Sequence, residues 1–176
     1  MTTGAAYVLG TFDTKARELD FVAERLRSEG FPVVRVDVGT LGGGHEVEVG
    51  AREVAAHHPD GADAVLAAGD RGRAVEAMSL AAERWIAGRA AIAGVIGLGG
   101  SGGTSIATAA MRQLPVGLPK IMVSTVASGD VGGFVGGSDI VMAYSVTDIA
   151  GLNRISRRVL GNAAGALAGM MRAAGR

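Results

Sequence analysis

Residues 91–105 read A-I-A-G-V-I-G-L-G-G-S-G-G-T-S, and this stretch decides the fold. The apolar run over 91–96 predicts a buried strand, and the glycine run over 97–103 predicts the loop that follows it. A helix then runs to Gln113 and is ended by Pro115, because proline cannot continue a helix. A strand, a loop and a helix in this order form the unit from which parallel sheets are built.

Further strands and helices alternate on both sides of this unit. Apolar runs predict strands over 5–9, 33–38, 120–126 and 140–144, and helical spacing predicts helices that begin near Asp13 or Thr14, around 53–56, after Asp70 and after Asn153. The strands are apolar along whole runs, which is typical of strands buried on both faces. We therefore expect an α/β, doubly wound, Rossmann-like fold with a mainly parallel sheet of about five strands and helices on both faces.

The composition sets limits on the class of protein. The 176 residues carry 17 basic and 17 acidic side chains, a balance that excludes a generic nucleic-acid or anionic-membrane binder. With 48% hydrophobic residues, the chain predicts a single lobe over 1–176. The absence of cysteine excludes disulfides and thiolate catalysis. Without a membrane-length apolar stretch or the basic start of a signal peptide, we expect a soluble cytoplasmic protein.

Function is sought in the loops that follow the strands, because ligands of open parallel sheets bind outside the carboxyl ends of the strands. Four such loops, over 10–15, 97–105, 124–130 and 145–148, are rich in glycine, hydroxyl and carboxylate groups. The ligand-binding residues predicted from them are Thr11, Asp13, Thr14, Lys15, Gly99, Gly100, Ser101, Gly102, Gly103, Thr104, Ser105, Ser124, Thr125, Ser128, Gly129 and Asp130.

The glycine run contains G-x-G-x-x-G at Gly97, Gly99 and Gly102. A dinucleotide site also needs an acidic residue about 20 positions further on, and the stretch 114–125 has none, so we expect NAD not to bind. The run is not a P-loop either, because no Lys-Ser/Thr pair follows the glycines.

What remains is a more general anion site. Inward-turned N–H groups, a helix N-terminus and the hydroxyls of Ser101, Thr104 and Ser105 would hold the anion, and a valine in place of Gly102 would fill its position. The alternative is a tight strand-to-helix turn whose glycines serve packing.

Two further groups of residues could carry charge to a ligand. Lys15 stands at a helix start, where a cation opposes the helix dipole, so it could meet a phosphate or carboxylate with Asp13 as cap or metal contact. The alternative is a solvent-facing lysine beside an ordinary cap. Asp130 and Asp139 flank a second glycine cluster that could close over a ligand or hold Mg²⁺ through water; the alternative is that the aspartates simply form turns. No catalytic residue and no dedicated set of metal ligands is predicted.

Small residues repeat on the last predicted helix. Gly161, Gly165 and Gly169 form a stripe that permits close backbone approach, within the chain or between copies. A helix that contains so many glycines needs a tight neighbour to be stable. We therefore expect a homodimer or higher homo-oligomer, with twofold symmetry as the commonest arrangement.

Several longer tracts carry a resemblance to a known family. They are G-T-F-D-T-K at 10–15, G-D-R-G at 69–72, G-L-G-G-S-G-G-T at 97–104, P-K-I-M-V-S-T-V-A-S-G-D-V at 119–131 and the run from S-D-I to I-S at 138–156. They resemble the tomato mosaic virus resistance protein family, a two-lobed ATP-binding domain with many bacterial members. The resemblance implies ATP binding, an α/β fold and self-association. It also implies that this chain is the first lobe, either as part of a longer protein or with a second lobe that is encoded separately.

Three functions are carried forward from the sequence. The first is a nucleotide-binding lobe that holds the phosphates of ATP, alone or with Mg²⁺, over 99–105, with Lys15 and the 124–130 loop at the border of the crevice. The second is a catalytic lobe for a carboxylate or phosphorylated metabolite, in which Lys15 and Asp13 or Asp130 stabilise charge and transfer protons. The third is a protein-interaction module, because the plant relative's domain binds and inhibits a viral replication protein. Whether the chain is an enzyme stays open.

Overall fold

A parallel sheet forms the centre of the computed structural model, which describes residues 4–42 and 44–175. Its strands are β1 (Ala5–Gly10), β2 (Val33–Asp37), β3 (Ile92–Gly99), β4 (Lys120–Ser124) and β5 (Val141–Tyr144), in the order β2-β1-β3-β4-β5. Each neighbouring pair runs parallel. The five-stranded, doubly wound fold expected from the sequence is confirmed.

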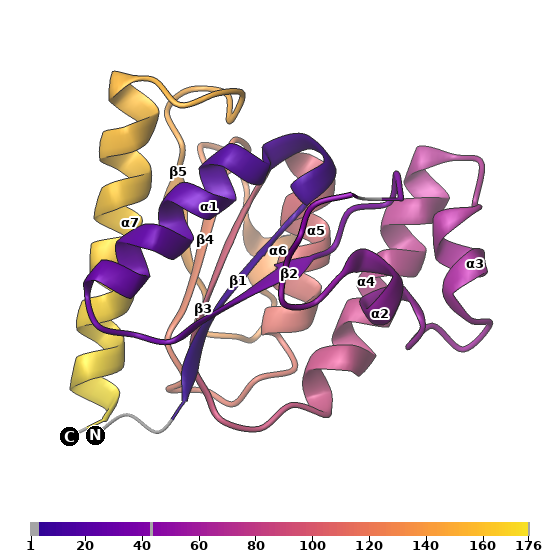
Figure 1. Ribbon diagram of the computed structural model, residues 1–176, viewed down its shortest axis with the longest axis horizontal. Coiled ribbons are helices and arrows are strands. Elements are labelled where there is room, and N and C mark those ends of the chain that lie inside the picture. Colours follow the sequence, from indigo (N-terminus) through magenta and orange to yellow (C-terminus); the bar gives the residue numbers. More distant parts are fainter. Residues whose placement is uncertain (1–3, 43, 176) are drawn as a thin grey trace.

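Helices cover both faces of this sheet (Figure 1). On one face, α1 (Phe12–Ser28) and α7 (Arg154–Ala174) pack over Val8 and Ile96. On the other face, α4 (Arg71–Ala87) and α5 (Ser101–Met111) pack over Leu9 and Met122, and Trp85 is buried with them. Three short helices complete the lobe: α2 (Ala51–Ala55), α3 (Ala62–Leu66) and α6 (Gly132–Val135). Two apolar cores, one on each face, hold the strand ends in place.

The glycine run 97–103 differs from its predicted loop. Gly99 is the last residue of β3 and Ser101 is the first of α5, so Gly100 alone joins strand and helix. The prediction of a long glycine-rich loop is therefore wrong. The turn is short because α5 packs closely on the sheet, which leaves no room for a longer loop.

Two other local expectations are also corrected. Helix α1 begins at Phe12 with Thr11 at its N-cap, so Asp13 and Thr14 lie inside its first turn and are not caps. The sequence pattern also missed α3, a five-residue helix that follows Gly61. By contrast, the Asp70 and Asn153 side chains cap α4 and α7 as expected.

The glycine stripe of α7 does not pack within the lobe. A Cβ built on Gly161, Gly165 or Gly169 meets nothing within 4 Å among the described residues. The buried face of α7 consists instead of larger residues such as Leu160, Leu167 and Met171. Packing of the stripe inside the chain is thus excluded for the described part, and self-association through it stays a prediction.

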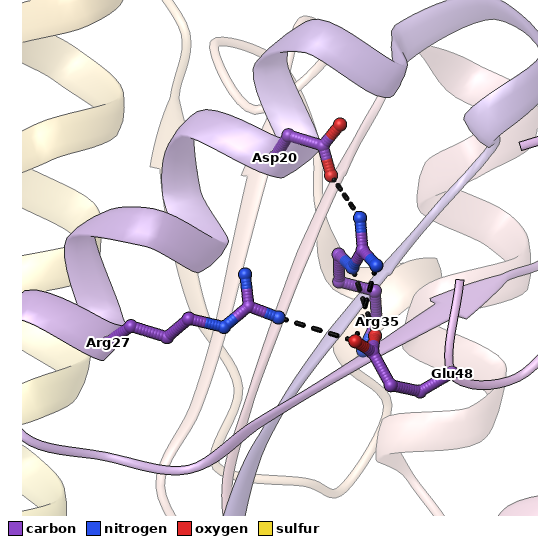
Figure 2. A network of polar contacts seen from close by, with 4 residues as sticks. All are labelled: Asp20, Arg27, Arg35 and Glu48. Atoms are coloured by element: carbon purple, nitrogen blue, oxygen red, sulfur yellow. Dashed lines mark hydrogen bonds and ion pairs between the residues drawn. The ribbon is translucent and has the colours of Figure 1, made fainter. Parts of the chain in front are cut away.

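A polar network holds the chain beyond β2 against the edge of the sheet (Figure 2). Arg35 of β2 donates to Asp20 of α1 at 2.8 Å and, through Nε, to Glu48 at 2.9 Å, while Arg27 reaches the same Glu48 at 3.3 Å. The hydrogen bonds that Arg35 donates to Glu48 and Asp20 raise the pKa of Arg35. Beside this network, Val49 bridges to Val36, so the returning chain is fixed next to β2.

Candidate ligand-binding site

The strand order creates a crevice. Strand β1 lies between β2 and β3. The helix that follows β1 packs on one face of the sheet, and the helix that follows β3 packs on the other face. Doubly wound proteins bind ligands at such a switch point, outside the carboxyl ends of the strands. A cleft of about 850 Å³ opens there, a volume typical of small-molecule sites. It is lined by residues that follow all five strands and by the stretch from α3 into α4.

The structure brings part of the predicted site together. The predicted residues that line the cleft are Thr11, Asp13, Thr14, Lys15, Gly100, Ser101, Gly102, Gly103 and Thr125. Those outside its lining are Gly99, Thr104, Ser105, Ser124, Ser128, Gly129 and Asp130.

Three of the outer residues have a structural role. The Thr104 and Ser124 hydroxyls are both buried and lie 2.6 Å apart, so they tie the end of β4 to the first turn of α5. Ser105 donates to the carbonyl of Ser101 at 3.1 Å, within the same helix. These hydroxyls fix the position of the α5 N-terminus beside the cleft.

The three glycines of the G-x-G-x-x-G pattern serve packing. A Cβ on Gly97 would lie 2.7 Å from Met122 Sδ, and one on Gly99 would lie 2.8 Å from the Cα of Gly103. A Cβ on Gly102 would lie 3.2 Å from Val75 of α4. The space beside Gly102 is therefore an interhelical contact, and that a valine there would also replace an anion stays a prediction.

Three helices begin at the cleft. The N-caps are Thr11 for α1, Asp70 for α4 and Gly100 for α5, and all three residues line the cleft. First-turn N–H groups of a helix lack intrahelical partners and carry partial positive charge. The contact between Gly102 and Val75 brings the first turns of α4 and α5 side by side. The backbone therefore contributes partial positive charge to the cleft, and Asp37 and Asp70 already accept from the N–H groups of Phe12 and Arg73.

Two cationic side chains also line the cleft. The first turn of α1 is distorted at Lys15, with φ −132° and ψ 25°, and the Lys15 ammonium donates to the carbonyl of Ile149. Arg71 is exposed at the start of α4, and its guanidinium makes no hydrogen bond or ion pair with the rest of the described chain. Both side chains have donors to offer to a ligand.

Two aspartates meet at the base of α1. Asp37 is 2% exposed, and its Oδ1 accepts from the N–H of Phe12 at 3.0 Å and from that of Gly39 at 2.8 Å. Burial raises the pKa of Asp37, and the two backbone hydrogen bonds oppose that rise. Asp13 accepts from the Leu41 N–H at 3.2 Å through Oδ2, while its Oδ1 is buried without a partner among residues 4–42 and 44–175.

Several lining residues were missed by sequence reasoning. Asp70 and Arg71 lie in the G-D-R-G tract, which was noted only as part of the resemblance. Leu41 and the apolar residues of α3 come from the stretch after β2, which has no clear periodicity. Asp37, the last residue of β2, lies outside the lining beside Asp13, and the sequence gives no sign of it because a lone acid at a strand end is common in turns.

The second glycine cluster lies apart from the cleft. Asp130 accepts from the N–H of Gly132 at 2.8 Å, an arrangement typical of turns. Asp139 pairs with Lys120 at 2.6 Å, where β4 begins, on the opposite edge of the sheet. Asp139 is thus no part of the cleft.

Two other findings concern the described residues as a whole. They hold no group of three or more His, Cys, Asp or Glu side chains arranged to bind a metal ion. Their helices are all too short or too polar to cross a membrane.

The fold is that of a doubly wound α/β domain with a cleft at its switch point. A family model described as "Uncharacterised protein family (UPF0261) N-terminal domain" matches residues 4–176, and the chain belongs to this family. A UPF0261 protein of Mesorhizobium japonicum is 57% identical over 93% of this chain and 41% of its own length. The ToMV resistance protein Tm-1(GCR237) of Solanum lycopersicum is 39% identical over 94% of this chain and 24% of its own length.

These findings confirm the resemblance drawn from the sequence tracts. The chain spans less than half the length of these relatives. Activities and partners of the whole proteins therefore reach this chain only as proposals.

Proposed function

We propose that this domain binds a nucleotide, ATP in the first place, with the phosphates at the first turns of α4 and α5. The observation that carries the proposal is the convergence of three helix N-termini on one cleft that also contains Lys15 and Arg71. Helix N-termini stabilise phosphate groups through free N–H groups and through the helix dipole. The resemblance to an ATP-binding family supports the same ligand.

The side-chain charges of the cleft favour the magnesium complex of ATP. Lys15 and Arg71 supply two positive charges, whereas Asp13, Asp70 and Asp148 supply three negative ones, so the formal sum is −1. A polyphosphate would be repelled by this lining unless a cation came with it. Mg²⁺ is usually held by one or two carboxylates together with substrate phosphates, and the exposed Asp148 is suited to that role.

A second function is favoured by one observation. The buried, unpartnered Oδ1 of Asp13 lies near the buried Asp37, whose pKa is raised. A carboxylate oxygen that lines a cleft and has no partner among the described residues can exchange a proton with a bound ligand. A carboxylate or phosphorylated metabolite that is processed in this cleft is therefore the second candidate, with Asp13 as the acid or base.

Thermal unfolding with and without ligand tests the first proposal. At a hundredfold excess over its Kd, MgATP should stabilise the folded chain by about 2.7 kcal/mol. Ser101→Asp should abolish that shift, because a carboxylate in the first turn of α5 repels phosphate. The same carboxylate favours the helix N-terminus, so the fold should remain intact.

Ser101→Asn is the matched neutral control and should keep the shift. MgATP that fails to stabilise either this chain or a longer protein containing it would overturn nucleotide binding. A shift with a small carboxylate or phosphorylated metabolite in place of MgATP would favour the second candidate.

A further inference from the structure

The lining of the cleft changes character along its length. Toward β4 and β5, polar residues such as Thr125 and Asp148 border it. Apolar side chains of the lining come from Leu41, α3, α4 and α5: Leu41, Leu66 and Val75 are accessible, Val65 and Ile106 are buried behind them, and we call this set the apolar shelf. Four of these residues are buried or half-buried, whereas Leu41 at the rim is 78% exposed.

The apolar shelf begins where the anion site ends. Val75 is the side chain that a Cβ on Gly102 would approach to 3.2 Å, so the shelf adjoins the first turn of α5. On the other side, the backbone of Leu41 is bound to Asp13, at the first turn of α1, by a hydrogen bond of 3.2 Å. An anion held at these turns would therefore carry the rest of its molecule directly onto the shelf.

We propose that the apolar shelf receives the base of the nucleotide, with the Leu41 side chain packed on the ring. This inference rests on the proposed nucleotide function and adds the place of the base. A leucine that is largely exposed at the mouth of a cleft gains from being covered by a flat apolar ring. The guanidinium of Arg71, which has no partner within residues 4–42 and 44–175, also lines the cleft, and guanidinium groups stack well on aromatic rings.

The shelf recognises the base mainly by packing. Its side chains are aliphatic and offer no hydrogen-bond donor or acceptor, so a purine of either kind fits the same surface. The domain should therefore bind ligands that have a base more tightly than ligands that lack one. ATP and GTP should differ little.

Isothermal titration of the chain with MgATP, MgGTP and magnesium tripolyphosphate tests this inference. We expect both nucleotides to bind at least about tenfold more tightly than tripolyphosphate. Leu41→Ser should weaken MgATP by about tenfold and leave tripolyphosphate unchanged. Val116→Ser is the matched control, because Val116 is also 78% exposed but lies outside the cleft lining.

The outcomes separate the two proposals. Equal affinity for tripolyphosphate and MgATP would overturn the base site while preserving an anion site. A Leu41→Ser variant that weakens both ligands equally would also overturn it, because the effect would then act through Asp13 and not through the base. Binding of none of the three ligands would remove the nucleotide function itself.

Discussion

Two lysines stand at opposite edges of the sheet and differ in how fully they are bonded. Lys120, at the start of β4, is wholly buried and donates to Pro115 O at 2.8 Å, Leu118 O at 2.9 Å and Asp139 Oδ1 at 2.6 Å. Lys15, at the carboxyl edge, is half-buried and has the Ile149 carbonyl as its acceptor among the described residues. A lysine has three donors, so Lys120 is saturated whereas Lys15 is not.

The difference separates structural charge from charge that is available to a ligand. A buried ammonium is costly unless its donors are all used, which is the situation of Lys120. Lys15 keeps free donors beside the first turn of α1, at the cleft. The comparison predicts that one lysine supports folding and the other supports binding.

The largest expected effect is on stability at the amino edge. Lys120→Met should lower the free energy of unfolding by about 3–5 kcal/mol, because two backbone carbonyls and Asp139 lose their common donor. Urea unfolding measures this loss. A loss below about 1 kcal/mol would mean that water replaces the ammonium and that Lys120 is not a structural group.

A smaller effect is expected at the carboxyl edge. Lys15→Met should change the free energy of unfolding by less than about 1 kcal/mol, since one carbonyl loses its partner near solvent. It should weaken MgATP at least about tenfold, as measured by titration. If the affinity for MgATP did not change, Lys15 would serve only to hold the loop that contains Ile149.

The smallest expected effect concerns how the free energy of unfolding depends on pH, and it has opposite signs for Asp139 and Asp37. The hydrogen bond from Lys120 lowers the pKa of Asp139, so its contribution to stability is present above the ordinary carboxyl pKa. That contribution is lost as the pH falls through the lowered value. Burial raises the pKa of Asp37, so its contribution is present below the ordinary pKa and is lost as the pH rises through the raised value.

Urea unfolding of two amide variants between about pH 3 and pH 7 measures this opposition. Asp139→Asn should be less stable than the parent at neutral pH, and the deficit should shrink on acidification. Asp37→Asn can keep both backbone hydrogen bonds and should be more stable than the parent at neutral pH, with the gain fading on acidification. Parallel profiles for the two variants would contradict the comparison.

Local patterns determined the five strands, the long helices and the class of fold, but not α3 or the short turn at Gly100. Whole apolar runs indicated buried parallel strands, and Asp70 and Asn153 marked the starts of α4 and α7 correctly. These features depend on neighbours within a few residues, so the sequence alone contains them. The end of the sheet at which the cleft opens also followed, because parallel strands place their carboxyl ends together.

Only the tertiary structure decided which side chains line the cleft. The G-x-G-x-x-G pattern suggested phosphate contacts, yet Gly97 and Gly102 are small because Met122 and Val75 occupy the space beside them. Asp139 looked like a site residue until β4 brought Lys120 next to it. In the sequence, a glycine or a carboxylate that serves packing looks the same as one that binds a ligand. The difference depends on residues from distant parts of the chain, which only the tertiary structure brings into contact.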